Sequence, residues 1–343
     1  MIDTLGVWLP ETSEIGVGLQ QAAGIEKHPI PITVSETIDL FQEKGLLQKG
    51  YSVSEKEAEP RGDRSPQVLI SGKNLRFEYP GGVEALRGIT FDIHQGEWLM
   101  ILGRNGAGKS TLANLLVGLK KPTGGRLNLF GKEASRWDVQ TLANQIALVF
   151  QNPEHQFLTD SVADEIGYSL MAQGVSDPRE IEGRTDTWLG KLGLLEQKDT
   201  HPFALSAGLK RRLGVATMLV GDPQILLVDE PTYGQDKEMT FTLMSLMEEI
   251  RDQGVSVVMI THDMRLVQEY GERVLVMSGG QLLFDGLSEG LFTRDKILHQ
   301  ANLRRTILHK LLREMEFHGA PVETRVRKTA DLERLLKLRL SGE

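Results

Sequence analysis

The chain has 343 residues, which is more than one average domain and fewer than three. Apolar residues make up 40% of it and charged residues 25%, as in a globular protein with a substantial core, while a net charge of −8 argues against nucleic acid as the main partner. The absence of cysteine excludes disulfides, cysteine nucleophiles and thiolate metal sites, and the longest apolar runs are strand-sized, so we expect any membrane to be met through a partner.

The two ends of the chain resemble each other. Laid over the C-terminal tail at an offset of 292, the N-terminal segment matches it without a gap at Ile15/Ile307, Leu19/Leu311, Pro29/Pro321, Val34/Val326, Thr37/Thr329, Asp39/Asp331 and Leu40/Leu332. Chance agreement between two amphipathic helical stretches is one explanation. The other is a repeat, in which residues 1–51 are the tail of an earlier copy of the same domain and the native chain extends further upstream.

The composition predicts four segments. Residues 52–66 are polar, charged and nearly free of large apolar groups, which predicts a linker after the N-terminal extension at 1–51. Residues 67–290 form the main predicted domain. Residues 291–343 interleave basic, acidic and apolar side chains at helical spacing, so we expect a packed helical tail.

Strand and helix patterns alternate through the main domain. Half-buried strands at its start are followed by buried strands at 98–102, 225–230 and 255–262, with helical periodicity between them. This alternation predicts a mostly parallel α/β core. Residues 161–195 are predicted to be helical and to form a small separate lobe.

The first chemical motif is "GRNGAGKST" (103–111), which lies between a buried strand and a helix and fits the phosphate-binding P-loop. Its glycines let the backbone wrap closely around a polyphosphate, and successive amides and the helix N-terminus direct positive partial charge at the phosphates. Lys109 would contact the β- and γ-phosphates, and Ser110 would hold Mg²⁺. The residues predicted to bind ATP in this loop are Asn105, Gly106, Ala107, Gly108, Lys109, Ser110 and Thr111.

The second motif is "ILLVDEP" (225–231), whose apolar run places Asp229 and Glu230 at the carboxyl end of a strand, where α/β sheets bind ligands. Asp229 would hold Mg²⁺ through water, and Glu230 could act as the base that polarises the attacking water. An acidic pair after a strand can also be a helix cap, but the P-loop favours the catalytic interpretation. His262 ends the next predicted strand, which places it near the γ-phosphate.

Together with Tyr79, Gln151, "LSAGLKRR" (205–212) and Asp236, these motifs resemble in order and spacing the nucleotide-binding subunit of an ABC transporter over residues 67–285. The resemblance implies an α/β P-loop NTPase ABC domain with a mostly parallel sheet, an antiparallel β subdomain and a helical subdomain. It implies ATP and Mg²⁺ as cofactors. It also implies a pair of ATPase domains at the cytoplasmic face of the cell membrane, which close on ATP and reopen on hydrolysis.

The same resemblance implies a role for each residue. Tyr79 would stack on adenine, and Gln151 would contact both Mg²⁺ and the attacking water. His262 would hold the γ-phosphate and that water in place, and Asp236 would lie at the dimer seam. The signature residues that complete the ATP site of the partner domain would be Ser206, Ala207 and Gly208.

The signature departs from the family pattern at Ala207, where a second glycine is usual, and at Leu209, where glutamine is usual. Ser206 and Gly208 keep a hydroxyl and a close backbone approach at a helix N-terminus, so weaker activity is plausible and loss is not implied. We expect the basic run at 210–212 to be a solvated face or to neutralise nearby phosphates, and not to bind nucleic acid.

Two stretches narrow the resemblance to energy-coupling-factor ATPases, which power import of vitamins and transition-metal ions: residues 149–170 and "DEPTYGQD" (229–236). That group implies two partners, another ABC ATPase domain, as a homodimer or a fused half, and an integral membrane transport subunit that contacts residues 152–170. Acidic side chains there would suit arginines of the membrane subunit. They could equally form a solvated helix N-terminus capped by Ser161. These acids are Glu154, Asp160, Asp164 and Glu165.

The alternative is a soluble ABC ATPase of the DNA-repair or translation type. DNA-repair proteins of this class carry a long coiled coil, whereas here Gln151 and Leu205 are 54 residues apart without sustained heptads. Translation proteins would need basic surfaces and a charged linker helix, and this chain is acidic with a short linker. A P-loop kinase or GTPase would have no use for "LSAGLKRR".

Overall fold

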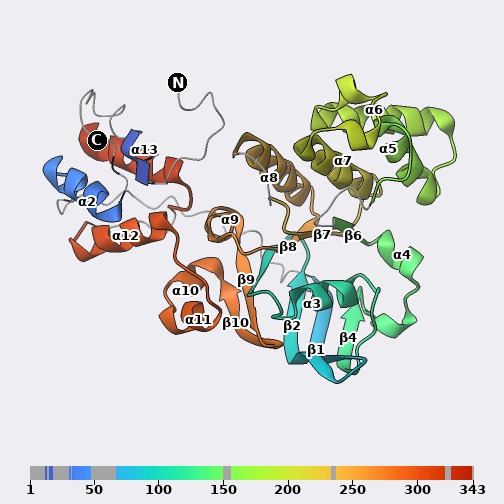
Figure 1. Cartoon of the computed structure of the whole chain (residues 1–343), viewed down its shortest axis with the longest axis horizontal. Helices are drawn as coiled ribbons and strands as arrows, with labels where there is room; N and C mark the ends of the chain where they lie inside the picture. Colours follow the sequence, from blue (N-terminus) through green and yellow to red (C-terminus); the bar gives the residue numbers. More distant parts are fainter. Residues whose placement is uncertain are drawn as a thin grey trace. The chain divides into compact units, whose positions relative to one another are not determined.

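The computed structural model describes residues 12–13, 15–17, 31, 33–47, 67–149, 156–232, 237–320 and 326–341. The chain divides into two compact units, whose elements Figure 1 traces. The central unit comprises Pro66–His262 and Glu272–Gly286, and the terminal unit comprises Met1–Ser65, Asp263–Gly271 and Leu287–Glu343. The predicted linker at 52–66 lies outside the described residues, so it stays a prediction.

The central unit contains a six-stranded sheet in the order β10-β9-β3-β8-β7-β6. The pairs β3–β8, β3–β9, β6–β7 and β7–β8 are parallel. Every residue of β3 and β8 is buried, as expected for strands of a parallel sheet that is covered on both faces. The predicted parallel core is therefore confirmed. The strands are β3 (Trp98–Leu102), β6 (Ile146–Val149), β7 (Ile225–Asp229), β8 (Ser256–Ile260), β9 (Arg273–Ser278) and β10 (Gln281–Leu287).

A second sheet in the same unit has the order β2-β1-β4-β5, and all its neighbouring strands pair antiparallel. It confirms the antiparallel β subdomain that the resemblance implied. The turn between its two long strands contains Gly81 and Gly82, both with positive φ (109° and 86°), which side chains with a Cβ rarely adopt. The strands are β1 (Val68–Tyr79), β2 (Val83–His94), β4 (Gly124–Leu129) and β5 (Lys132–Glu133).

Helices of the central unit follow cap signals in the sequence. Ser161 caps α5, and Asp177 caps α6 with a proline at the first helical position. Gly193 ends α6 in the left-handed conformation (φ 65°). The helices α5, α6 and α7 contact one another and form the predicted helical subdomain. The helices are α3 (Lys109–Leu116), α4 (Val139–Ala143), α5 (Val162–Ala172), α6 (Pro178–Leu192), α7 (Ala207–Leu219) and α8 (Lys237–Asp252).

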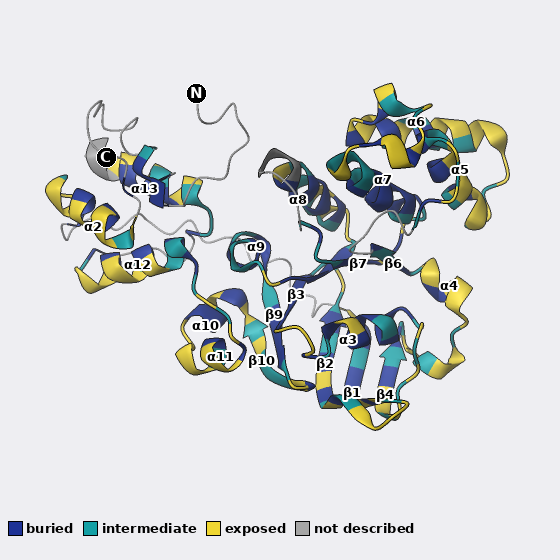
Figure 2. Ribbon diagram, in the orientation of Figure 1, coloured by how far each residue is buried: buried dark blue, intermediate teal, exposed yellow. Residues whose placement is uncertain are grey.

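One apolar core joins the two sheets of the central unit around α3. It includes Leu75 and Phe91 from the antiparallel sheet, Ile101 and Leu227 from the parallel sheet, and Leu112 from α3. Figure 2 shows buried residues along the strands of both sheets. Because α3 packs within this core, the loop that precedes it is held at the carboxyl end of β3.

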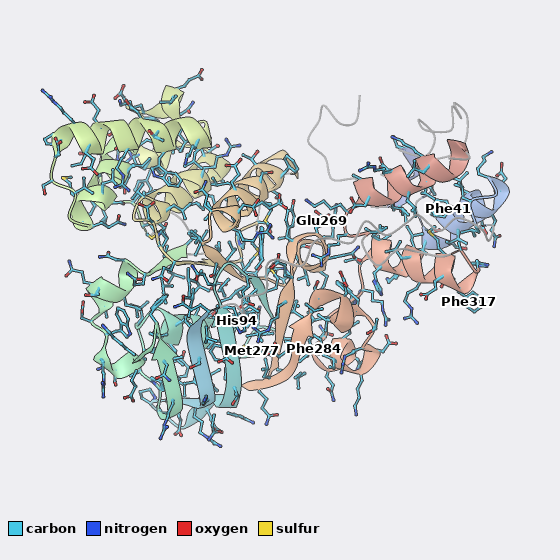
Figure 3. All side chains as sticks on the ribbon, turned by 180° about the vertical axis from the view of Figure 1, so that it is seen from behind. Phe41, His94, Glu269, Met277, Phe284 and Phe317 are labelled. Carbon is cyan, nitrogen blue, oxygen red and sulfur yellow. The ribbon has the colours of Figure 1, made fainter. Side chains whose placement is uncertain are left out.

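The terminal unit is helical and combines both ends of the chain. Its core includes Phe41 from the N-terminal segment and Leu311, Met315, Leu332 and Leu336 from the tail. Figure 3 labels Phe41 among the helices of this unit. No described helix in either unit is long and apolar enough to cross a membrane. The helices are α2 (Val34–Glu43), α9 (Met264–Tyr270), α10 (Ser288–Phe292), α11 (Asp295–Gln300), α12 (Ile307–Phe317) and α13 (Thr329–Ser341).

Candidate active site

The P-loop is shaped by glycines that cannot be replaced without strain. Gly103 has φ 147°, and a Cβ there would lie 2.3 Å from the carbonyl oxygen of Met277, which Figure 3 labels. Gly108 has φ 102° and caps α3, and a Cβ there would lie 2.6 Å from the carbonyl oxygen of Ala85. Gly106 has φ 79° and open space around it, so its backbone can approach a phosphate closely.

Lys109 begins α3 and is buried, with a side-chain nitrogen that folds back over the loop. Its Nζ donates to the carbonyl oxygens of Gly103 (2.7 Å) and Arg104 (3.2 Å). A bound polyphosphate would offer stronger acceptors at the same place, because hydrogen bonds between charged groups are stronger than those to neutral carbonyls. The loop therefore holds its ammonium group where a phosphate would meet it.

Three further side chains stand at the ends of neighbouring strands. Asp229 is the last residue of β7 and pairs in register with Ile260 of β8. Glu230 follows it, and His262 follows β8 after one residue. His262 Nδ1 lies 2.8 Å from Glu230 Oε1, with the histidine exposed and the glutamate side chain 16% exposed. Since β8 lies between β7 and β3, these groups and the P-loop share one edge of the sheet.

Glu230 has a strained backbone, with φ 48°. A non-glycine residue in this region typically costs about 1–3 kcal/mol and persists only where its surroundings hold it. Here Glu230 N donates to the carbonyl oxygen of Ile260 (2.8 Å), and Arg211 Nη1 donates to the carbonyl oxygen of Glu230 (2.7 Å). The main chain on both sides of the carboxylate is thus fixed.

The charges at this edge are partly removed from water. Burial lowers the pKa of the Lys109 ammonium, and Glu230 and Asp229 oppose that by raising it. Burial raises the pKa of the Asp229 carboxyl, Glu230 raises it further, and Lys109 lowers it. At this partly buried edge two carboxylates face one ammonium group. The excess of negative charge favours the binding of a cation.

Arg211 was expected to belong to a solvated basic face, and this expectation was wrong. The residue is 6% exposed, and its bond to the Glu230 carbonyl joins α7 to the carboxyl end of β7. Burial lowers the pKa of its guanidinium, and Glu230 raises it. Its burial could have been inferred from the helical period of α7. Arg211 lies four residues before the buried Val215 and eight before Leu219, so it shares their face of the helix.

Tyr79, the predicted adenine-stacking residue, ends β1 and contacts the P-loop helix α3. Its hydroxyl lies 3.0 Å from Thr111 Oγ1, and its ring stands edge to face with Phe77 at 4.9 Å between centroids. Lys120 Nζ lies 4.9 Å from the centre of the Tyr79 ring. Adenine stacking on this ring stays a prediction, and it would place the base next to Lys120.

The signature residues begin α7. Ser206 is the cap, and its side chain accepts from Leu209 N at 3.4 Å, while Ala207 and Gly208 are the next two residues. Ser206 and Ala207 are exposed. Because the cap uses the backbone amide of residue 209, the leucine side chain at that position does not prevent it.

The donors for Mg²⁺ are oxygen atoms of the kind this ion prefers. The exposed Ser110 lies in the first turn of α3, and Asp229 lies at the end of β7, both at the same sheet edge. Among the described residues no group of three or more histidine, aspartate or glutamate side chains is arranged to hold a metal. The set thus fits an ion held by a hydroxyl, a carboxylate through water and nucleotide phosphates.

Two predicted site residues, Gln151 and Asp236, lie outside the described residues, and their roles stay predictions. The acidic cluster after Gln151 is partly described. Glu165 is 2% exposed, and its Oε1 accepts hydrogen bonds from Leu158 N and Thr159 N. The expectation that it would face arginines of a partner was therefore wrong, because its carboxylate holds the preceding loop.

The capping alternative for this cluster is confirmed at α5. Ser161 accepts from Asp164 N at 3.0 Å and donates to Asp164 Oδ2 at 2.7 Å. Acidic side chains in a first helical turn also interact favourably with the helix dipole. Of the two remaining acids, Asp160 is fully exposed and Glu154 lies outside the described residues.

Comparison with known proteins agrees with this geometry. Residues 86–233 match the family model described as ABC transporter. CbiO1 of Clostridium perfringens, part of the ABC transporter complex CbiONQ, is 32% identical over 72% of this chain and 99% of its own, with a TM-score of 0.62. The chain belongs to the ABC transporter ATP-binding family. Its fold, its P-loop ATPase site and the use of ATP with Mg²⁺ are those of this family.

Two further relatives of this ABC domain are informative. The dimeric ATP-binding cassette MJ0796, seen in a post-hydrolysis state with ADP and Pi, is 26% identical over 64% of this chain and 99% of its own, with a TM-score of 0.59. YkoD of Bacillus subtilis, an ATP-binding protein whose name provisionally assigns it to HMP/thiamine import, is 36% identical over 87% of this chain and 52% of its own length. The chain spans about half the length of the curated relatives it matches.

Proposed function

We propose that this chain is an ATP-hydrolysing, energy-coupling subunit of a membrane importer for a micronutrient, a vitamin or a transition-metal ion. The observation that carries the hydrolytic part is the contact of 2.8 Å between Glu230 and His262, at the strand ends beside Lys109. In this arrangement Glu230 accepts a proton from the attacking water. His262 orients the water and the γ-phosphate, and Lys109 stabilises the charge of the phosphates.

Mg²⁺, held by Ser110 and Asp229, would neutralise phosphate charge during the reaction. The main chain of Glu230 is fixed by its hydrogen bonds with Ile260 and Arg211, and its carboxylate contacts His262. Such preorganisation is the main source of electrostatic catalysis, because the groups need not reorient when charge develops.

We further propose that two ABC domains enclose the nucleotides between them. The exposed start of α7, with Ser206 and Gly208, would meet the γ-phosphate bound by the partner domain. Arg211 lies on the same helix and bonds the Glu230 carbonyl. Closure over the partner's ATP would thus be transmitted through α7 and Arg211 to this chain's own catalytic carboxylate.

The part of the proposal that concerns import of a micronutrient rests on similarity to known proteins. CbiO1 is part of a transporter complex, and YkoD carries a thiamine-import name. The sequences at 149–170 and 229–236 support the energy-coupling-factor type. On this proposal the chain acts at the cytoplasmic face of the membrane, and the solute is recognised by another polypeptide.

A membrane subunit would dock on the start of the helical lobe through apolar side chains. Tyr168 and Met171 are one helical turn apart on α5 and are 47% and 54% exposed. Leu158 is 71% exposed, and its amide is bound by Glu165 of the same helix. With Glu165 buried, these three side chains and the exposed Asp160 form the surface offered to a partner.

The hydrolytic part is tested with His262→Ala. ATP turnover should fall about 100-fold or more, in the range of a lost acid–base or positioning group, while ATP affinity stays near that of the wild type. Steady-state ATPase assays and equilibrium nucleotide binding measure the two quantities. His299→Ala, an exposed histidine of the terminal unit, is the control and should change neither. Full turnover by His262→Ala would refute the assigned site.

The coupling part is tested with the double variant Tyr168→Glu and Met171→Glu. A tagged chain expressed with its natural membrane neighbours should retain the membrane subunit, and this variant should lose it while keeping ATP binding. Leu195→Glu is the matched control, because Leu195 is 52% exposed elsewhere in the helical lobe. If the native membrane yields only soluble partners such as ribosomes, the transport proposal fails and the soluble ABC alternative gains.

A further inference from the structure

A pocket in the terminal unit is lined by more basic than acidic side chains. Its volume is ≈ 560 Å³, which is in the range of sites that hold small organic ligands. It is formed by α11, the loop before α12 and one face of α12, all within the terminal unit. Because the basic groups outnumber the acidic ones, the pocket favours an anion. The charged side chains that line it are Arg304, Arg305, Lys310 and Arg313, against Asp295 and Glu314.

Arg305 is held in the wall of this pocket with one donor to spare. Its Nε donates to the carbonyl oxygen of Phe292 (2.8 Å), and its Nη1 pairs with Asp295 Oδ1. Its Nη2 is buried and has no hydrogen-bond partner among the described residues. A buried donor without a partner costs free energy, which an acceptor brought by a ligand would relieve. Since the guanidinium is already fixed by two contacts, little side-chain freedom would be lost on binding.

Two of the basic groups act together on their neighbours. A hydrogen bond from Arg305 lowers the pKa of the Asp295 carboxyl, and the charges of Arg305 and Arg313 lower it further. Burial, together with the charges of the same two arginines, lowers the pKa of His309 from 6.5 to about 4. Two guanidinium groups that both act on these side chains are close enough to act on one bound anion.

The pocket also has an apolar wall, made by Leu298, Leu303 and Phe317. Phe317 is the last residue of α12 and is 83% exposed, and Figure 3 labels it. It lies on the same face of α12 as Lys310 and Arg313, because these residues are spaced three and four positions apart. A large exposed ring next to fixed cations suits a ligand that combines a negative charge with an apolar group.

We propose that this pocket binds an organic phosphate. Its four cations hold the phosphate group, and Phe317 contacts the apolar part of the ligand. Guanidinium groups suit phosphate because they donate two parallel hydrogen bonds to its oxygens. The pocket is built from residues that belong to none of the ATPase motifs, so it is a second phosphate site beside the P-loop. A soluble metabolite and a phospholipid headgroup share this chemistry, and the experiment distinguishes these two sources.

The first measurement is hydrogen exchange in α11 and α12 of the full chain, with phenyl phosphate as the probe. At a probe concentration ten times its dissociation constant, exchange there should slow about 10-fold, because the opened pocket does not bind. Inorganic phosphate should bind about 3- to 10-fold more weakly than phenyl phosphate, since it cannot contact the ring. Phe317→Ala should remove this difference between the two probes. Equal affinities in the unaltered chain would contradict the assignment of an organic ligand.

The basic groups are tested with the double variant Arg304→Gln and Arg313→Gln. Both arginines are exposed, so the fold should persist, and affinity for phenyl phosphate should fall about 10- to 100-fold. The matched control is Lys296→Gln with Arg334→Gln, which removes the same charge from exposed positions of the same unit that do not line the pocket. It should bind within about twofold of the wild type. An equal loss in both variants would mean unspecific attraction and would overturn the proposal.

The source of the phosphate is read from flotation with vesicles. Capture by vesicles of phosphatidylcholine with phosphatidylglycerol, lost in the Arg304 and Arg313 variant and kept in the control, would assign a lipid headgroup. Slowed exchange with phenyl phosphate and no capture that depends on these arginines would assign a soluble metabolite. Neither slowed exchange nor such capture would overturn the proposal. None of these measurements uses ATP, so their failure is separate from failure of the ATPase assignment.

Discussion

The central and terminal units differ in how their key residues are held. In the central unit, Lys109, Asp229 and Glu230 are polar, partly desolvated and in one case strained, and hydrogen bonds fix them at a sheet edge. In the terminal unit the important side chains are apolar and meet from positions about 290 residues apart. A catalytic site needs particular residue types at short spacings. An apolar core needs only apolar side chains of suitable volume at the helical period. Substitutions should therefore separate activity from stability cleanly between the two units.

The largest expected effect is on stability, in the terminal unit. Phe41→Ala removes a fully buried ring and should lower the free energy of unfolding of this unit by about 3–5 kcal/mol. Denaturant unfolding followed by hydrogen exchange in the helices α12 and α13 measures it. ATP affinity should be unchanged. Phe317→Ala, which removes an exposed ring, should shift stability by about 0.5 kcal/mol or less.

The reverse case is Lys109→Ala in the central unit. Loss of charge-assisted bonds to phosphate should weaken ATP binding about 10- to 100-fold, with the terminal unit as stable as before. Titration of a fluorescent ATP analogue measures the affinity. Lys121→Ala, an exposed lysine beyond the end of α3, should bind ATP normally. If instead the Lys109 variant unfolds the terminal unit, the two units are not independent.

A smaller effect is expected at Arg211, which positions Glu230 without reaching the nucleotide. Arg211→Lys should lower the turnover number about 10-fold, because a single flexible ammonium holds the Glu230 carbonyl less well than a guanidinium. ATP affinity should stay within about twofold, so the change should appear in kcat and not in binding. Arg212→Lys, whose guanidinium bonds the Leu192 carbonyl instead, should leave kcat unchanged.

The smallest effect concerns acid sensitivity of the terminal unit. His309 stacks on Phe292, and burial, with Arg305 and Arg313 nearby, lowers its pKa from 6.5 to about 4. Between these pH values the unfolded chain binds more protons than the folded one, so stability falls as the pH falls through 6.5 toward 4. His309→Phe keeps the stack and should flatten this part of the thermal-unfolding profile. An unchanged slope would remove His309 as its cause.

Much of the central unit could be predicted from sequence because its chemistry is local. The P-loop, Asp229, Glu230 and His262 each follow a buried strand, and parallel strands bring their carboxyl ends to one edge. Arg211 and Glu165 were misjudged because charge suggested exposure, while the partner that justifies burial is a backbone group far along the chain or in a loop. Charged residues are buried when such partners exist, and composition does not reveal them.

The terminal unit could be anticipated only through repetition. The apolar residues of its helices recur at the ordinary helical period. This pattern indicates that each helix has a buried face, but it does not identify the element that covers that face. The match between Leu40 and Leu332 was visible in the sequence, yet their common core needed the fold. The place of α9 in this unit also needed the fold. This helix begins shortly after His262, and its Gln268 donates to the Arg327 carbonyl of the tail at 3.3 Å.

The central claim is that Glu230 is the base of an ATP-hydrolysing site, and Glu230→Gln tests it most directly. The amide keeps the size and the contact with His262 but cannot accept the proton of the attacking water. The account predicts ATP affinity close to that of the wild type and turnover lowered by about 100- to 10,000-fold, with Glu249→Gln on the exposed face of α8 unaffected. Undiminished hydrolysis by the Glu230→Gln protein would contradict it.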